Sequence, residues 1–152
     1  MEIKSPAFAE GEMIPKKYTC DDVNVSPPLQ WSGAPEGTKS YALIADDPDA
    51  PVGTWVHWVL FNIPADVTQL PENFPPQDKF DNGAVHGKND FRKLGYGGPC
   101  PPGGTHRYFF KLYALDTTLD LKPGASKKDV LNAMKGHVLD QCQLMGKYKR
   151  QR

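Results

Sequence analysis

The sequence has neither a long apolar run nor an excess of one charge. No stretch of about 18 apolar residues occurs in the 152-residue chain, so we expect no insertion into a membrane. The start of the chain lacks the apolar core of a signal peptide, and we expect a cytoplasmic protein. Lysine plus arginine and aspartate plus glutamate number 18 each, so the formal net charge is zero. Such a chain has no field to hold nucleic acid, and any bound anion needs a local cluster of donors.

Motifs typical of enzymes and metal centres are also missing. The sequence contains no GxSxG, HExxH or GxGxxG motif, no CxxC, and no pair of histidines at zinc-site spacing. We therefore expect no metal, no cofactor and no enzymatic activity. The cysteines Cys20, Cys100 and Cys142 cannot all pair within one chain, and reduced thiols are expected in the cytoplasm. A cysteine hydrolase built on Cys100 stays a minor alternative, because His57 or His106 could approach it in space.

What the chain does have is proline and glycine, spread along its whole length. Fifteen prolines and fourteen glycines interrupt a composition that is 39% hydrophobic and 24% charged. This composition is globular, and the length predicts one domain over 1–152. Because proline removes a backbone donor and glycine opens unusual backbone angles, short strands joined by rigid loops are favoured over a helical bundle.

Strands are predicted where apolar and β-branched residues concentrate. The segments 40–45, 55–63 and 107–115 carry this pattern, and 55–63 is apolar on both faces. The proline-rich stretch 64–81 predicts a long ordered loop with at most a short strand. Weaker candidates for strands are the segments 2–8, 29–31, 83–87 and 144–150.

One helix is signalled near the C-terminus. Ser126 and Asp129 form a variant of the capping box, and apolar residues follow at four-residue spacing through Met134 to Val138. Gly136 is expected to end or kink this helix, and a second short helix is predicted through 139–142. The sequence thus predicts a mainly β protein, a sandwich of two antiparallel sheets with one or two short helices near the C-terminus.

Three segments contain residues that could form a site. In DDPDAP, Pro48 and Pro51 restrict the backbone, so the carboxylates of Asp47 and Asp49 point in fixed directions. The simpler interpretation is an acidic surface turn. The rigidity favours a binding role, because rigid loops at sheet ends commonly carry functional groups.

A histidine lies inside the strand that follows. Strand alternation places His57 on one face with Trp55, Val59 and Phe61. A histidine in these surroundings needs a hydrogen bond. It is either a core residue bonded to a backbone carbonyl or a pocket wall that donates a ring N–H to a ligand oxygen.

The third segment is the glycine- and proline-rich stretch 95–108. Alternation places His106 with Tyr108 on one face and Arg107 on the other, where a salt bridge to an acid such as Asp49 is expected. The glycines allow close approach of the backbone, whereas the prolines have no N–H to donate. This stretch could form the rim of a small anion site. It is not a nucleotide-binding loop, because no Lys-Ser/Thr pair follows the glycines.

Together these motifs resemble those of the phosphatidylethanolamine-binding proteins, also called Raf kinase inhibitor proteins, in their short bacterial and archaeal branch. The resemblance covers the whole chain and rests on DPDAP, W-x-H and GPCPP followed by HRY. It implies a β-sandwich with a small surface cavity that accepts phosphate, acetate or phosphorylated head groups. It also implies a cis peptide between Gly53 and Thr54. The ligand-binding residues that it implies are Asp47, His57, His106, Trp55, Pro51, Gly98 and Tyr108.

The resemblance also sets the expected function. It implies a non-enzymatic binding protein for a small anionic ligand, with a protein kinase or protease as a further partner and a homodimer as an expected assembly. An inhibitor that acts through a protein surface is the alternative, and a phosphoester hydrolase is a weaker one. Asp22 and Arg92 replace glycines common in the family, which predicts changed turns. The longer eukaryotic members carry a C-terminal helix that lines the cavity; we expect this chain to lack that helix and to have a more open pocket.

A carboxylate beside an anion requires an explanation, since like charges repel. Asp47 can orient one imidazole and favour its protonated form, or it can itself be protonated and donate. In both cases, binding is expected to strengthen as the pH falls through the histidine range, near 6.5 for an unperturbed group.

Overall fold

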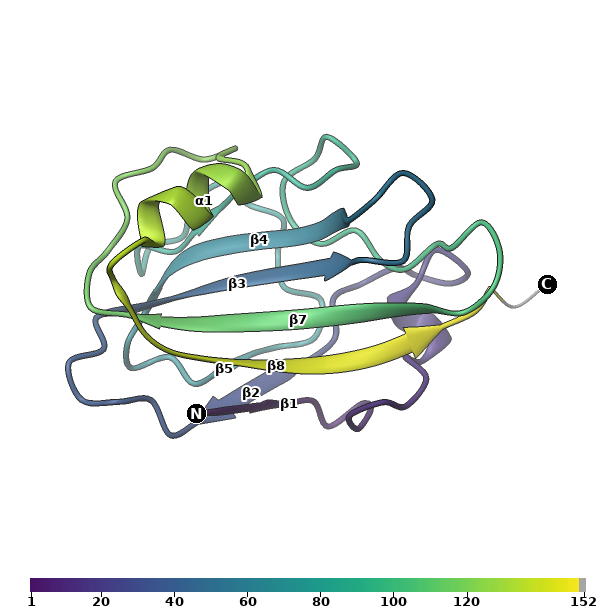
Figure 1. Cartoon of the computed structure of the whole chain (residues 1–152), viewed down its shortest axis with the longest axis horizontal. Coiled ribbons are helices and arrows are strands. Elements are labelled where there is room, and N and C mark those ends of the chain that lie inside the picture. The colour runs from purple at the N-terminus through teal and green to yellow at the C-terminus, as the bar shows by residue number, and fades with distance from the viewer. Residues whose placement is uncertain (151–152) are drawn as a thin grey trace.

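The computed structural model describes residues 1–150 and has two antiparallel sheets (Figure 1). The smaller sheet has the order β1-β2-β5, and the larger has the order β6-β4-β3-β7-β8. The strands are β1 Glu2–Lys4, β2 Leu29–Ser32, β3 Ser40–Asp47, β4 Trp55–Pro64, β5 Gln69–Leu70, β6 Val85–His86, β7 His106–Leu115 and β8 Val138–Tyr148. A 3-10 helix, η1, spans Lys16–Tyr18, and the helix α1 spans Lys127–Met134. The predicted fold class is confirmed.

The sequence pattern explains the centre of the larger sheet. β3 is buried along its whole length and pairs with β4 on one side and β7 on the other. Alternate residues of β7, from His106 onward, are buried toward the smaller sheet. The core between the sheets contains large aromatic side chains, including Trp31, Trp58, Phe110 and Tyr148.

The opposite face of the larger sheet is covered by α1. Ser126 and Asp129 form the predicted capping box, and Val130 and Met134 pack onto a second apolar cluster of the sheet. The helix ends at Met134, before Gly136, which has a φ of 81°. Within residues 1–150, no helix is long and apolar enough to cross a membrane.

The predicted second helix through 139–142 is wrong. These residues belong to β8, which pairs with β7 from Val138 to Tyr148. Leu139 is 41% exposed, so the apolar residues here do not form a helical stripe against the core. The long run of backbone hydrogen bonds along β7 outweighs the weak local helix signal.

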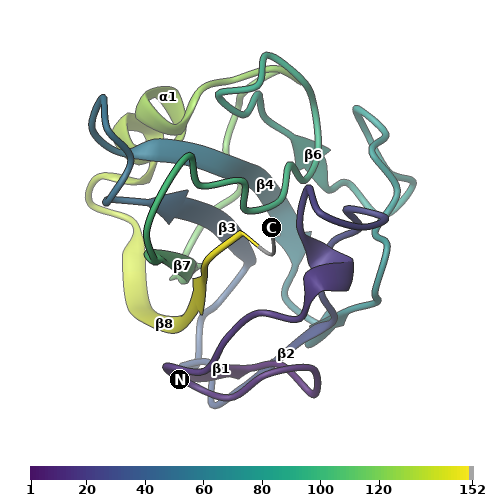
Figure 2. The same ribbon diagram turned by 90° about the vertical axis from the view of Figure 1, so that its right-hand side faces the viewer.

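Loops from distant parts of the chain meet at one end of the larger sheet. The β3–β4 loop and the η1 segment lie at opposite sides of this end, and the loop before β7 lies between them (Figures 1 and 2). A disulfide and a salt bridge join them across the sequence. This end of the molecule therefore brings the three segments of interest together.

Candidate functional site

Asp47 and His106 form a buried pair at the end of β3 and the start of β7. The Nδ1 atom of His106 lies 2.6 Å from Oδ2 of Asp47, and both side chains are almost fully buried. The other oxygen of Asp47 accepts a hydrogen bond of 2.7 Å from the backbone N–H of Asp49. With both oxygens engaged, the carboxylate orients the imidazole, and Nε2 of His106 is the nitrogen left for another group.

His57 is held by a backbone carbonyl instead of a carboxylate. Its Nδ1 lies 2.6 Å from the oxygen of Gly97, and because a carbonyl only accepts, this nitrogen carries the proton. Burial lowers the pKa of His57 below its ordinary value, although the Gly97 carbonyl and the charge of Asp47 oppose this shift. The ring is therefore neutral near pH 7. Within the described chain, no hydrogen bond engages its Nε2.

Aromatic rings connect the two histidines. The ring of His57 packs edge-on against Tyr108 at 5.2 Å, and His106 stacks on the same tyrosine at 6.4 Å. Burial, together with the charges of Asp47 and Asp49, raises the pKa of Tyr108, so its phenol stays neutral. The structure thus brings Asp47, His57, His106 and Tyr108 into one cluster.

The predicted face of His57 is wrong because of a β-bulge. The register shifts where Ala45 pairs with Trp58 and Asp46 pairs with Val56, which leaves His57 as the extra residue. His57 therefore contacts Tyr108 on the side of the smaller sheet, whereas Val59 and Phe61 face α1. Period-two alternation cannot reveal a bulge of this kind.

A cavity of about 250 Å³ opens beside His57. It is mostly apolar, and the predicted residues Pro51, Trp55 and His57 are in its wall. The Asp47–His106 pair and Tyr108 lie next to this wall but do not line the cavity. The lining residues are Ala50, Pro51, Val52, Trp55, His57, Phe91, Cys100 and Pro102.

Gly98 has a packing role instead of a place at the rim. Its N–H donates to the side-chain oxygen of Asn24 at 2.9 Å, so this donor is already used. A Cβ at this position would collide with that oxygen and with the carbonyl of Tyr18. Glycine is thus required here because two segments of backbone approach closely.

Phe91 was not among the predicted site residues, but it packs on two residues that line the cavity. Its ring lies edge-on to Trp55 at 5.6 Å and to His57 at 5.4 Å. The side chain of Asn89 accepts hydrogen bonds from the N–H groups of Phe91 and Lys93 and so holds this turn. Arg92 sits in the turn with a φ of 63°, the left-handed conformation that favours glycine. An Asn followed two residues later by an aromatic residue was the available signal, and it is a weak one.

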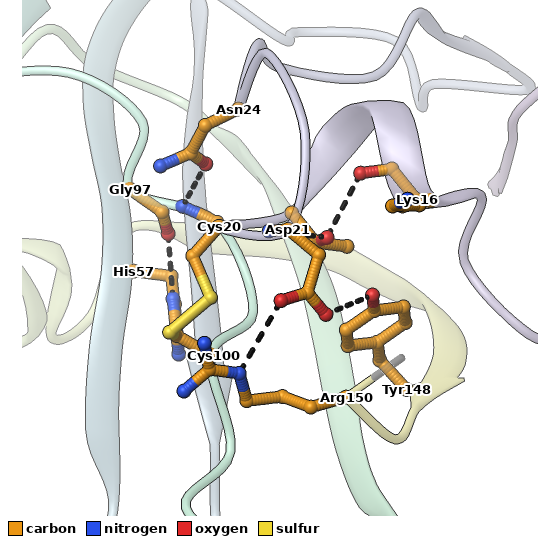
Figure 3. The surroundings of a disulfide bond; sticks show 11 residues. Lys16, Cys20, Asp21, Asn24, His57, Gly97, Cys100, Tyr148 and Arg150 are labelled. Atoms are coloured by element: carbon orange, nitrogen blue, oxygen red, sulfur yellow. Dashed lines mark hydrogen bonds and ion pairs between the residues drawn. A yellow bond between two sulfur atoms is a disulfide. The ribbon is translucent and has the colours of Figure 1, made fainter. Parts of the chain in front are cut away.

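The expectation of reduced thiols is wrong for two of the three cysteines. Cys20 and Cys100 form a disulfide with a Cα–Cα distance of 5.4 Å, and Cys142 is free (Figure 3). The fold brings together residues that are 80 positions apart, a proximity that spacing in the sequence cannot show. In this state the sulfur of Cys100 is not a nucleophile, so the structure does not favour the cysteine hydrolase.

The expected cis peptide is also wrong. Every peptide bond among residues 1–150 is trans, including the bond between Gly53 and Thr54. Gly53 has a φ of 108° and closes the exposed β3–β4 loop by donating its N–H to the carbonyl of Ala50. The loop therefore turns at a left-handed glycine.

The expected partner of Arg107 is confirmed. Its guanidinium donates two hydrogen bonds, of 2.9 and 2.8 Å, to the two oxygens of Asp49, and its backbone N–H donates a third. The Arg107 guanidinium lowers the pKa of Asp49 to about 2. This pairing holds the β3–β4 loop, and with it the Pro51 wall of the cavity, against the start of β7.

The chain is similar in sequence and in fold to known proteins. The family model described as phosphatidylethanolamine-binding protein matches residues 4–149. A UPF0098 protein from Methanothermobacter thermautotrophicus is 59% identical and covers 99% of both chains, and one from Aquifex aeolicus is 52% identical over 99% of this chain and 89% of its own.

Two solved structures share the fold along their whole length. CT736 of Chlamydia trachomatis, a homologue of the phosphatidylethanolamine-binding proteins, has a TM-score of 0.91 at 41% identity and covers 99% of this chain and 97% of its own. Escherichia coli YbcL, described as a member of the mammalian family, also has a TM-score of 0.91, at 37% identity and with 99% and 98% covered. The chain therefore belongs to the phosphatidylethanolamine-binding protein family.

Proposed function

We propose that this protein is a non-enzymatic binding protein whose cavity takes phosphate or a phosphorylated head group. The observation that carries the proposal is the cluster of two imidazoles and one carboxylate beside a small open cavity. A volume of about 250 Å³ is below the range of about 300–1,000 Å³ for drug-sized ligands, so a small head group is favoured.

The chemistry of the His57 imidazole supports an anion that carries a proton. Neutral His57 offers Nε2 as an acceptor, to which the hydroxyl of a monoprotonated phosphate can donate. If His57 is instead protonated, the same nitrogen donates to a phosphate oxygen. Either route brings one proton to the contact between the ligand and His57. Affinity should therefore rise as the pH falls.

The buried pair favours binding over catalysis. Asp47 is buried behind His106 and does not line the cavity, so its carboxylate orients the imidazole instead of reaching a ligand there. The phenol of Tyr108 stays protonated, which suits it to donating and not to attacking. We therefore propose the absence of turnover. A cytoplasmic location, a homodimer and a protein kinase or protease partner stay predictions from the sequence.

Calorimetric titration with inorganic phosphate and with phosphoethanolamine between pH 5 and pH 8 tests the proposal. We expect the affinity to increase toward pH 5 and His57→Ala to abolish the signal. His137→Ala is the matched control, because this exposed histidine bonds Asp116 outside the cavity. Affinity that increases toward pH 8, or unchanged binding by His57→Ala, would reject the site. Hydrolysis of a phosphoester that His57→Ala abolishes would show an enzyme instead.

A further inference from the structure

The disulfide joins the cavity wall to a second segment of the chain. Cys100 lines the cavity, and Cys20 lies two residues after the end of η1 (Figure 3). The backbone N–H of Cys20 also donates to the carbonyl of Pro99 at 3.1 Å. The wall formed by Cys100 and Pro102 is therefore attached to the body of the protein through this one covalent link.

The two partners of this link are held to different degrees. The segment around Cys20 is anchored by Tyr18, whose hydroxyl bonds Glu72 at 2.5 Å, and by Asp21, which accepts from Tyr148 at 2.5 Å (Figure 3). The Cys20 side is thus fixed to the rest of the fold independently of the disulfide.

The loop on the Cys100 side has far fewer attachments. Gly97 exchanges hydrogen bonds with His57 through both its N–H and its carbonyl, and Gly98 donates to Asn24. Beyond Cys100, Pro101 is buried, but no hydrogen bond holds 101–104 within the described chain, and residues 102–105 are exposed. The two prolines there have no N–H to donate. Besides the hydrogen bond from Cys20 to Pro99 and the burial of Pro101, the disulfide is therefore what attaches the second half of the loop to the fold.

The bond is also open to exchange. Both Cys20 and Cys100 are partly exposed, and accessible disulfides are the ones that thiols reduce most readily. The free Cys142 lies on β8, opposite Leu112, and burial raises the pKa of its thiol to about 11. It is a poor internal nucleophile, because a thiol attacks as its thiolate.

We propose that the Cys20–Cys100 disulfide is a reversible redox latch that holds the cavity wall in its binding form. A dithiol reductant transfers two electrons and two protons to the S–S bond, which breaks into two cysteine thiols while the dithiol becomes a disulfide. The loop after Gly98 is then released, and the wall formed by Cys100 and Pro102 leaves the cavity. This inference rests on the proposed function, of which it is the regulation.

The test compares oxidised protein with protein reduced by dithiothreitol. Inorganic phosphate is titrated into both forms at pH 6, and amide exchange is measured at Cys20, Gly97 and Gly98 in the absence of ligand. We expect reduction to weaken phosphate binding by about tenfold, a typical size for coupling between sites. Reduction should also remove exchange protection at Cys20, whose N–H donates to the carbonyl of Pro99, while Gly97 and Gly98 keep their protection. Reoxidation should restore both. Cys20→Ser/Cys100→Ser should behave as the reduced form in either condition, and Cys142→Ser should switch as the unmodified chain does.

The two readouts separate the latch from the binding function. If phosphate binds in neither form but reduction still removes exchange protection at Cys20, the proposed ligand is wrong and the latch stands. If phosphate binds equally in both forms, or if exchange at Cys20 is unchanged, the latch is overturned. Global loss of exchange protection on reduction also overturns it, because the bond would then be required for the fold itself.

Discussion

Removing the disulfide should destabilise the whole domain by a large and calculable amount. The bond closes a loop between residues 80 positions apart. The chain-entropy relation for that separation gives about 4.5 kcal/mol at 25 °C, which is an upper value because real unfolded chains are already partly compact. We expect Cys20→Ser/Cys100→Ser to lose about 2–4.5 kcal/mol. A domain with a stability of about 5–15 kcal/mol would remain folded, as the redox latch requires.

Urea unfolding under oxidising and reducing conditions measures this loss. The cross-linked unfolded chain exposes less surface, so the denaturant slope m should increase when the bond is removed. Cys142→Ser, which leaves the disulfide intact, should keep the slope of the oxidised protein. A loss below about 1 kcal/mol with an unchanged slope would refute the reasoning, because the bond would then not constrain the unfolded chain.

Three further outcomes follow from the site. The pKa of Asp49 is lowered to about 2, so its pairing with Arg107 stabilises the fold above pH 4, and this stabilisation is lost as the pH falls toward 2. The melting temperature of Asp49→Asn should therefore depend less on pH between pH 4 and pH 2 than that of the unmodified protein. Burial lowers the pKa of His57 in the folded protein, so below pH 6.5 the unfolded chain binds more protons than the folded one. Without ligand, the melting temperature should therefore fall from pH 7 to pH 5, and it should fall less steeply in His57→Gln. Gly98→Ala should cost about 1–3 kcal/mol in urea unfolding, because its Cβ would collide with Asn24, and full stability would contradict the close approach.

The main elements of the fold could be predicted because their patterns are strong. The segments 40–45, 55–63 and 107–115 lie within β3, β4 and β7, since continuous or alternating apolar residues leave few other solutions. The capping box at Ser126 located the start of α1 for the same reason, as it is a local signal read over four residues. The 3-10 helix η1 was missed, because one short turn carries little pattern of its own.

The errors share a cause, which is that each depends on contacts between distant residues. β8 was taken in part for a helix because only its pairing with β7 decides its state. The bulge at His57 depends on how β3 and β4 align, and the Cys20–Cys100 bond depends on where two loops meet. In contrast, the Asp49–Arg107 pair was expected from residue chemistry alone.

The DPDAP motif explains why a few residues can position so much of the site. Its two carboxylates point to opposite faces of β7, since Asp47 binds buried His106 and Asp49 binds exposed Arg107. These two contacts hold the start of β7 on both faces, so His106 stays in place even though few contacts hold the loop before it. Movement of that loop on reduction of the disulfide should consequently change the cavity wall while leaving the Asp47–His106 pair in place. The redox state would then act on access to the site more than on its charged groups.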